Sequence, residues 1–525
     1  MAHLIHELIY DAASRAPAAP ALSYAGAVMS YADLAGAVAA VAGGLRALGA
    51  ERHDRIAVWL HKREETVCAL FGAAAAGCAL VPVNPALRAP QAAAMLRDCG
   101  AHVLVTTGER LAGLAGALPD CPALRTVLVC GEPATPVAGV EVLGWADCLR
   151  AGARDGHRCI ETDMAALLYT AGSSGAPKGV ALSHRNLVAG AQSVARYLGI
   201  AQQDRLLAAL PFSLDYGLNQ LTSAFAGAAA VVLLNPLIAR DIVEAVECER
   251  ITGLAGVPAM WNELAALELS RAAATLRFIT SAGGVLPRPT LATLRRALPA
   301  TRVYLMYGLT EAFRSTYLAP EQLDHRPDSI GKPVPNAEVL VLRPDGQPCA
   351  PGEPGELVQR GPLVAMGYWN DPYRTAQCFK PLPARAGLPL AETAVWSGDT
   401  VKADEEGYLY FLRRGDDMII TSGYRVSPDE VEGVVYGTGL VEEAAAVGVA
   451  HPVLGQVIAV LATPRRGCAL DSSLLYGACQ ARLPEYMLPA MVDVRRAPLP
   501  RNRHGRIDRA LLADELAPLF AEVTP

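Results

Sequence analysis

A stretch of small and hydroxylated residues with a single lysine has the clearest chemistry in this sequence. It reads L-L-Y-T-A-G-S-S-G-A-P-K-G-V over residues 167–180, and the apolar run at 165–169 predicts a buried strand leading into it. Glycines let backbone N–H groups turn toward an anion, hydroxyls donate further hydrogen bonds, and Lys178 supplies a mobile positive charge. Because glycine follows Lys178, the stretch is not a Walker A loop, and it lacks the G-x-S-x-G pattern of a nucleophile elbow. It predicts a phosphate-binding loop.

The elements that position this loop are predicted from the pattern of apolar residues. Short β-branched runs alternate with Ala/Leu-rich segments of helix length, which is typical of parallel sheets covered by helices on both faces. The predicted strands of this kind are residues 55–60, 102–106, 127–130, 229–234 and 302–306. Further along, residues 337–342 and 356–359 alternate and are bounded by Pro/Gly turns, which indicates antiparallel pairing.

A third pattern, with helix–strand alternation and more charge, begins near residue 413. We therefore expect the fold class to be α/β with two domains. Residues 1–412 form a large N-terminal domain of stacked α/β sheets plus a small antiparallel β subdomain. Residues 413–525 form a small α+β C-terminal domain.

Composition restricts the class of protein. The chain has 525 residues, of which 52% are hydrophobic and 19% charged, with a formal net charge of −6, so it is globular and carries no basic block for nucleic acid. Twelve cysteines without a C-x-x-C pair indicate reduced thiols in a cytoplasmic protein. The acidic residues Glu7 and Asp11 argue against a signal peptide. Proline and asparagine interrupt the uncharged stretches at 66–87 and 219–239, so each predicts a buried helix and strand and no membrane span.

The string at 167–180 resembles the phosphate-binding signature of the AMP-forming adenylating superfamily, which includes acyl-CoA synthetases, peptide-synthetase adenylation domains and luciferases. Ala171 and Ser174 replace the usual serine and threonine. The resemblance recurs in order along most of the chain, in Y-G-L-T-E at 307–311, G-E-L at 355–357, G-Y-W at 367–369, S-G-D at 397–399 and L-P-E-Y-M-L-P at 483–489. It identifies residues 1–412 as an AMP-binding/adenylation domain and residues 413–525 as a mobile lid.

The resemblance implies catalytic roles for the phosphate loop and the Y-G-L-T-E motif. Lys178 and the loop would hold the β- and γ-phosphates of ATP and then pyrophosphate. Thr310 would contact the α-phosphate, and Glu311 would hold Mg²⁺, a hard cation that prefers oxygen ligands. The loop positions are Thr170, Gly172, Ser173, Ser174 and Gly175.

The resemblance also implies an adenosine site and a two-stage reaction. Tyr307 and Gly308 would lie near adenine, Asp399 would accept both ribose hydroxyls, and Arg414 would complete the nucleotide-binding set. A carboxylate would attack the α-phosphate of ATP to give an acyl-adenylate and pyrophosphate. The thiol of coenzyme A, or of an acyl or peptidyl carrier-protein phosphopantetheine, would then displace AMP.

The sequence departs from the family pattern near the predicted hinge and in the late motif. Residues 413–425 resemble the hinge motif, with Arg414 and the hinge residue Asp416 kept, but Arg413 replaces glycine and Ile420 replaces lysine. By resemblance, the C-terminal domain rotates about Asp416 between the two stages. Arg506 stands at the catalytic position where the family carries its adenylation lysine, and a planar guanidinium is not equivalent to a compact ammonium group. An altered enzyme and a catalytically impaired nucleotide-binding homologue both remain possible interpretations.

The substrate pocket is expected around Asp215, Gly283 and Gly284. Amino-acid-activating members carry an aspartate at the position of Asp215 to bind the substrate's α-ammonium, whereas the alternative is pairing with a protein arginine or a helix N-terminus. Further pocket candidates are Asn219, Gln220, Trp261 and Ala282. Longer stretches, including residues 307–318, resemble both acyl-CoA ligases of exosortase-A systems and prolyl–carrier-protein ligases. The predicted function is an acyl-CoA ligase acting on a small-molecule carboxylic acid, with a proline-like amino-acid–carrier-protein ligase as the alternative. No residue favours a luciferase-like oxygenase.

Overall fold

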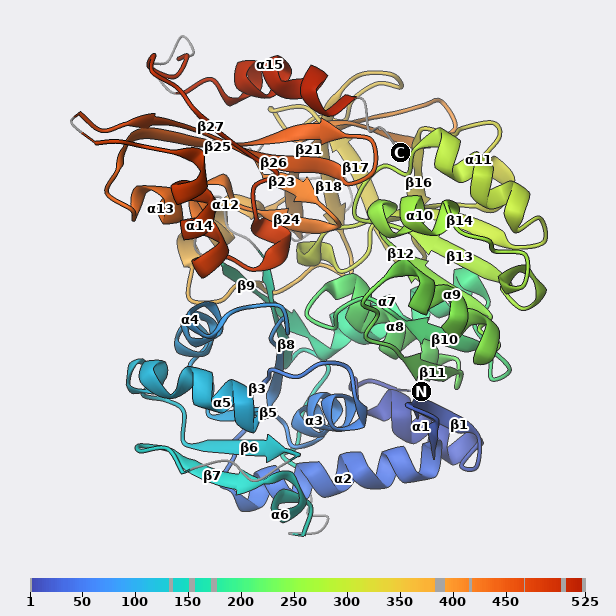
Figure 1. The fold of residues 1–525 in the computed structure, drawn as a ribbon. Coiled ribbons are helices and arrows are strands. Elements are labelled where there is room, and N and C mark those ends of the chain that lie inside the picture. The colour runs from blue at the N-terminus through green and yellow to red at the C-terminus, as the bar shows by residue number, and fades with distance from the viewer. Residues whose placement is uncertain are drawn as a thin grey trace.

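The computed structural model describes residues 2–131, 136–150, 156–170, 177–382, 392–414, 418–466, 468–501 and 507–521 (Figure 1). Its strands form three sheets, and helices separate most consecutive parallel strands. The predicted fold class, α/β sheets with an antiparallel β part and a small C-terminal α+β part, is confirmed.

The first sheet carries the predicted phosphate loop. Its order is β19-β9-β8-β4-β3-β5-β6-β7, and it is parallel except for the antiparallel edge made by β8, β9 and β19. Its strands are β3 (Arg55–Val58), β4 (Ala79–Pro82), β5 (Val103–Thr107), β6 (Thr126–Cys130), β7 (Glu141–Gly144), β8 (Met164–Thr170), β9 (Lys178–Ser183) and β19 (Gly367–Tyr368). The helices of this part are α1 (Glu7–Arg15), α2 (Tyr31–Ala47), α3 (Glu64–Ala75), α4 (Ala89–Cys99), α5 (Gly108–Leu114), α6 (Trp145–Arg150) and α7 (His184–Leu198).

The second sheet has 14 strands and changes character along its length. Strands β10 to β14 and β1 with β11 pair in parallel, and from β14 to β22 the pairing is antiparallel, as the turn-rich sequence predicts. The strands are β1 (Pro20–Tyr24), β2 (Ala27–Ser30), β10 (Arg205–Ala208), β11 (Ala230–Leu233), β12 (Gly253–Gly256), β13 (Phe278–Ser281), β14 (Arg302–Tyr307), β15 (Thr316–Leu318), β16 (Ser329–Pro333), β17 (Glu338–Leu342), β18 (Gly355–Arg360), β20 (Phe379–Pro381), β21 (Thr393–Ala403) and β22 (Leu409–Arg414). Its helices are α8 (Asp215–Ala226), α9 (Ala239–Cys248), α10 (Pro258–Ala265), α11 (Arg288–Ala297) and α12 (Pro372–Cys378).

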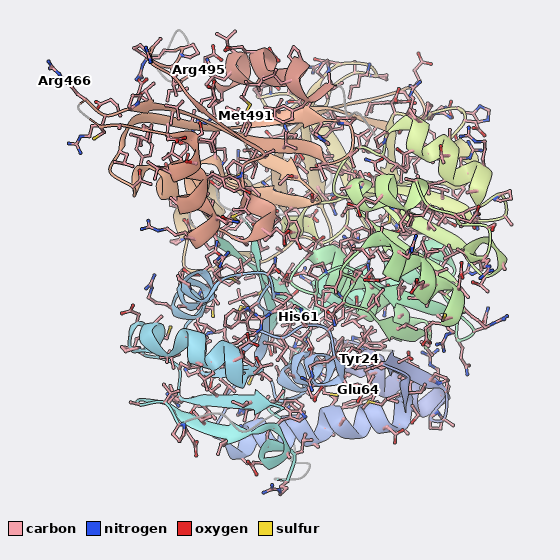
Figure 2. All side chains as sticks on the ribbon, in the orientation of Figure 1. Tyr24, His61, Glu64, Arg466, Met491 and Arg495 are labelled. Carbon is pink, nitrogen blue, oxygen red and sulfur yellow. The ribbon has the colours of Figure 1, made fainter. Side chains whose placement is uncertain are left out.

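The third sheet contains the C-terminal strands, drawn in orange and red at the top of Figure 1. Figure 2 labels Met491 in this upper part and His61, just after β3, in the lower part of the same view. The strands are β23 (Ile419–Thr421), β24 (Tyr424–Val426), β25 (Val441–His451), β26 (Gly455–Pro464) and β27 (Met491–Val494), with α13 (Pro428–Tyr436), α14 (Ser472–Arg482) and α15 (Arg509–Ala521).

The two uncharged stretches of the sequence are buried helix–strand units. Residues 66–87 include most of α3 and all of β4, and residues 219–239 include most of α8 and all of β11. Phe71 of α3 and Phe225 of α8 pack edge to face with ring centroids 5.3 Å apart, which fixes these helices between the two large sheets. Within the part of the chain that the structure describes, no helix combines the length and the apolar character that a membrane crossing needs.

Candidate active site

A cavity of about 1290 Å³ lies where the two large sheets meet the C-terminal elements. The predicted site residues that line it come from the ends of β8 and β14, the start of α8 and the loop after β13. They are Thr170, Asp215, Gly283, Gly284, Tyr307, Gly308 and Thr310. The carboxyl ends of neighbouring parallel strands are a usual place for such a site, because their loops converge at one edge.

Lys178 is placed by the hairpin that closes the phosphate loop. It begins β9 and pairs directly with Thr170, the last residue of β8. Residues 171–176 of the loop lie outside the described residues. The Oγ1 of Thr170 is buried and has no hydrogen-bond partner among the described residues. The two ends of the loop therefore present a cation and a hydroxyl side by side.

Lys178, Glu311 and Tyr368 form a buried triangle of hydrogen bonds. The ammonium of Lys178 donates to Glu311 Oε1 at 2.7 Å and to the Tyr368 hydroxyl at 3.0 Å, and that hydroxyl donates to the same Oε1 at 2.8 Å. Burial alone would raise the pKa of Glu311, but Lys178, Arg425 and the Tyr368 hydroxyl lower it to about 2. Glu311 is therefore an anion at neutral pH.

The backbone around Glu311 is held by the segment that precedes the G-Y-W motif. Glu311 follows β14 in a short 3₁₀ turn, and its carbonyl accepts a hydrogen bond from the N–H of Ala365 at 2.9 Å. Asn186 of α7 donates to the carbonyls of Pro362 and Val364 at 2.6 and 2.8 Å. These bonds tie the segment just before β19 to Glu311 and α7, and β19, which carries Tyr368, pairs with β9 of the phosphate-loop hairpin.

The predicted adenosine residues also come together. The Tyr307 hydroxyl donates to Asp399 Oδ2 at 2.5 Å, and Asp399 is 2% exposed. Across the β21–β22 pairing, the backbone of Arg414 lies directly opposite Asp399. The Tyr307 ring lies 6.2 Å from that of Phe411, which also lines the cavity. An aromatic face beside a buried carboxylate suits a nucleoside with ribose hydroxyls.

Asp215, which also lines the cavity, has a partner within the protein. Its Oδ2 accepts a hydrogen bond from Arg314 Nη1 at 2.9 Å. Arg314 is 3% exposed, and it reaches Asp215 because Phe313 adopts a positive φ of 55° that turns the chain after Glu311. Desolvation raises the pKa of Asp215, and the guanidinium of Arg314 opposes that rise. In this structure Asp215 pairs with a protein arginine and is also the first residue of α8.

The C-terminal elements close the cavity. Gly423 has a φ of +81°, and a Cβ there would lie 2.6 Å from Val257 Cγ1, so only glycine fits this turn as it stands. The next residue, Tyr424, stacks on Tyr486 with ring centroids 4.0 Å apart. Arg88, the residue before α4, donates to two carbonyls at the end of α14, at 2.8 and 2.9 Å. The C-terminal domain thus contributes one wall of the site.

Comparison with known proteins decides the family. The sequence pattern of the AMP-binding enzyme family matches residues 9–369, and that of the AMP-binding enzyme C-terminal domain matches residues 430–506. The chain belongs to the AMP-binding enzymes. The predicted superfamily is confirmed, and so is the predicted class of enzyme, an AMP-forming acid–thiol ligase.

This AMP-binding enzyme has relatives with different acids and acceptors in their names. It is 32% identical over 505 residues to feruloyl-CoA synthase from an Amycolatopsis species, covering 94% of this chain and 95% of that one. It is also 32% identical over 527 residues to the L-proline–[L-prolyl-carrier protein] ligase of Streptomyces coelicolor, covering 93% and 92%. Among solved structures, o-succinylbenzoate CoA synthetase from Bacillus subtilis, bound with a product analogue, superposes with a TM-score of 0.81 at 27% identity, covering 97% and 98%.

The remaining predicted residues of the AMP-binding enzyme are not all in the cavity. Asn219, Gln220, Trp261 and Ala282 are buried and do not line it, and the indole of Trp261 donates to the carbonyl of Thr280 at 3.2 Å as part of the core. Six predicted residues lie outside the described residues: Gly172, Ser173, Ser174, Gly175, Asp416 and Arg506. The side chains of Arg413 and Arg414 also lie outside them.

Sequence reasoning gave no role to Tyr368, Arg425 or Arg314. Tyr368 stands in the G-Y-W motif and Arg314 in the stretch 307–318, both of which carried the resemblance, so membership in a motif was the signal that could have found them. Arg425 is charged and lies two residues after Gly423 of the cavity wall, and it lowers the pKa of Glu311.

The residues around Glu311 fit a magnesium ion held together with a nucleotide. Its second carboxylate oxygen, Oε2, is buried without a partner among the described residues. Those residues contain no group of three or more His, Cys, Asp or Glu side chains that could hold a metal ion. Mg²⁺ commonly binds through one or two carboxylates and the phosphates of its substrate, so a single carboxylate is sufficient.

Proposed function

We propose that the protein activates a small-molecule carboxylic acid as its acyl-adenylate at this cavity and passes the acyl group to the thiol of coenzyme A. The observation that carries this proposal is the buried triangle of Lys178, Glu311 and Tyr368 next to the Tyr307–Asp399 pair. The first group has the charges for a polyphosphate and its metal, and the second suits a nucleoside. Both groups lie beside the cavity, which Tyr307 and Thr310 line and which Glu311 adjoins as the residue after Thr310.

In the first stage, these side chains hold two anions close together. Lys178 leaves Glu311 for the β- and γ-phosphates, Thr310 contacts the α-phosphate, and Asp399 receives the ribose hydroxyls. Glu311 Oε2 would hold Mg²⁺, which supplies further positive charge to the phosphates when it is bound. The proton of Tyr368 remains on its hydroxyl, since burial and Glu311 raise the pKa of that group.

The position of the C-terminal domain suits the second stage. The turn containing Gly423 lies against Val257 at the cavity, whereas the described residues on either side of Arg506 do not line it. Rotation about Asp416 would exchange these segments and bring Arg506 to the phosphates for the first stage. The proposed domains are residues 1–412 and 413–525.

Coenzyme A is the proposed acceptor, and a carrier protein is the alternative. Both present the same phosphopantetheine thiol, and relatives named for each acceptor align over more than nine-tenths of this chain. We place the protein in the cytoplasm, because its twelve cysteines form no disulfide among the described residues and reducing compartments keep thiols in that state.

The test is acid-dependent exchange of labelled pyrophosphate into ATP, followed by hydroxylamine trapping of the adenylate and thioester formation with coenzyme A. A panel of fatty, aryl, hydroxy and amino acids should contain at least one acid that supports both exchange and trapping. Exchange without thioester formation would support the carrier-protein alternative. Absence of exchange with every acid, together with ATP binding by calorimetry, would instead support a nucleotide-binding homologue without turnover.

The alternative of a catalytically impaired homologue rests on two replaced lysines. Ile420 lines the cavity with an apolar side chain where the family pattern has lysine, and Arg506 replaces the second lysine. Arg506→Lys and Ile420→Lys would each increase adenylate formation if these replacements slow the protein. If Arg506→Lys leaves exchange unchanged or lowers it, arginine is a working group here and the impaired alternative loses its support.

A further inference from the structure

The ion pair between Asp215 and Arg314 is fixed in place beside the cavity. The guanidinium carbon of Arg314 lies 5.0 Å from the centroid of the Tyr216 ring and 5.6 Å from that of Phe313. Tyr216 is itself held by a hydrogen bond of 2.6 Å between its hydroxyl and that of Thr280. Arg314 is enclosed by these rings, while the Asp215 side chain keeps 19% of its surface exposed and lines the cavity. The arginine therefore lies behind the aspartate and does not itself line the cavity.

This arrangement changes what Asp215 offers to a substrate. An aspartate alone in the wall would attract a cation, but here the guanidinium already compensates its charge. An ammonium group brought to Asp215 would also approach Arg314, and like charges repel strongly where water is excluded. The pair accordingly has no net charge and favours an uncharged acyl group beside it.

The wall is nevertheless rich in hydrogen-bonding groups. The Oγ atoms of Ser213 and Ser281 are buried and have no partner among the described residues, and both serines line the cavity with Asp215. Nε and Nη2 of Arg314 are also buried without a partner in the described part of the chain, but Arg314 does not line the cavity, so a ligand meets only the two serines directly. A buried hydroxyl left without a partner is costly, and as a donor each serine calls for an oxygen atom, from the ligand or from water held beside it.

We infer that Arg314 is a specificity-determining residue: by neutralising Asp215, it selects acids whose acyl group is uncharged and carries a hydroxyl, ether or carbonyl oxygen, and it disfavours α-amino acids. This inference rests on the proposed ligase function. It assigns Asp215 a different role from the one implied by the resemblance, in which the carboxylate binds an α-ammonium. Here Asp215 and Arg314 act together as a neutral polar surface.

Two sets of acids that differ in one group test the inference. The first is proline, tetrahydrofuran-2-carboxylic acid and cyclopentanecarboxylic acid, with NH₂⁺, O or CH₂ at one ring position. The second is phenylalanine, 3-phenyllactic acid and 3-phenylpropionic acid. For the wild-type protein we expect kcat/KM of hydroxamate formation to be highest for the oxygen-bearing member and at least about tenfold lower for the ammonium-bearing member of each set.

Two substitutions of Arg314 separate the effect of its charge from that of its shape. Arg314→Met leaves Asp215 uncompensated, so the amino acids should gain at least about tenfold relative to their neutral analogues. Arg314→Lys keeps a positive charge beside Asp215 and should keep the wild-type order. Because each result is a ratio of two acids on one preparation, a smaller folded fraction in a variant does not alter it.

The outcomes distinguish this inference from the proposed function. Equal or faster turnover of proline or phenylalanine by the wild type would overturn the role of Arg314 and leave the ligase function standing. An unchanged order in Arg314→Met would also overturn it. If neither set yields hydroxamate with any variant, the inference is rejected as well, and pyrophosphate exchange with the wider acid panel decides the ligase function independently.

Discussion

The ammonium of Lys178 lies 2.7 Å from Oε1 of Glu311, so the cation proposed for the phosphates and the carboxylate proposed for the metal neutralise each other in this structure. Glu311 is buried and Lys178 is half-buried, with 5% and 13% of their side-chain surfaces exposed. Such a pair avoids the cost of two isolated buried charges. When a nucleotide and its metal bind, each partner acquires a new counter-charge, and the pair can open without leaving either charge alone.

Lys178→Met should therefore abolish most of the first stage. The change removes the cation proposed for the β- and γ-phosphates, and loss of one such electrostatic contact lowers kcat by about 10²- to 10³-fold. Pyrophosphate exchange measures the effect. Lys332→Met is the matched control, since Lys332 is exposed and its ammonium lies 4.4 Å from the Tyr408 ring, outside the cavity. Equal loss in both variants would remove the special role of Lys178.

Tyr368→Phe should weaken the same stage to a smaller extent. The hydroxyl positions Lys178 and Glu311 through bonds of 3.0 and 2.8 Å but carries no charge itself. We expect kcat/KM for ATP to fall by about tenfold, the effect of roughly one hydrogen bond to a charged group. Tyr373→Phe, on the exposed face of α12, is the control and should retain full activity. A Tyr368→Phe variant with wild-type kinetics would show that the triangle has no positioning role.

Much of this arrangement follows from local patterns in the sequence. Parallel strands such as β5 and β6 were predictable because their apolar runs are short and separated by helix-length segments. The residues of the phosphate loop and of Y-G-L-T-E were identified by motif. Their contact could not be predicted from spacing, because Lys178 and Glu311 are 133 positions apart and approach only through β9, β14 and β19.

The partner of Asp215 could not be chosen from the sequence. Asp215 and Arg314 are separated by 99 positions, and their contact depends on the turn at Phe313, whose positive φ is uncommon for a bulky residue. Pairing between distant charges requires the path of the chain, which neither composition nor periodicity contains. The sequence left an arginine partner as one alternative, and the structure identifies which arginine it is.

Acid should destabilise the protein through a buried histidine pair. Burial, with a smaller effect of His6, lowers the pKa of His184 to about 4, and burial lowers that of His6 to about 4. Each is neutral when folded but has an ordinary pKa near 6.5 in the unfolded chain, so unfolding takes up protons between these values. The contribution of these histidines to the free energy of unfolding is therefore complete above pH 6.5. It falls as pH drops toward 4, by about 1.4 kcal/mol per pH unit for each histidine.

Urea unfolding at pH 7.5, 6 and 5 tests this dependence. His184→Gln removes one titrating group, so its free energy of unfolding should change with pH less steeply in this range than that of the wild type, by about 1.4 kcal/mol per pH unit. His325→Gln, at an exposed position, should keep the wild-type slope. If His184→Gln is as pH-sensitive as the wild type, other groups cause the acid destabilisation.

Gly423→Ala should separate the two stages of the reaction. A Cβ at this position would lie 2.6 Å from Val257 Cγ1, so the turn could not remain docked at the cavity, and the positive φ adds a local penalty of about 1 kcal/mol. Because the docked turn belongs to the proposed second stage, pyrophosphate exchange should stay within about threefold of wild type while thioester formation slows at least about tenfold. Gly439→Ala has a comparable φ of +71° but no atom within 4 Å of its Cβ, so it carries the backbone penalty without the collision. Similar slowing of thioester formation in both variants would assign the effect to a destabilised C-terminal domain, and selective loss in Gly423→Ala would assign it to docking of the turn.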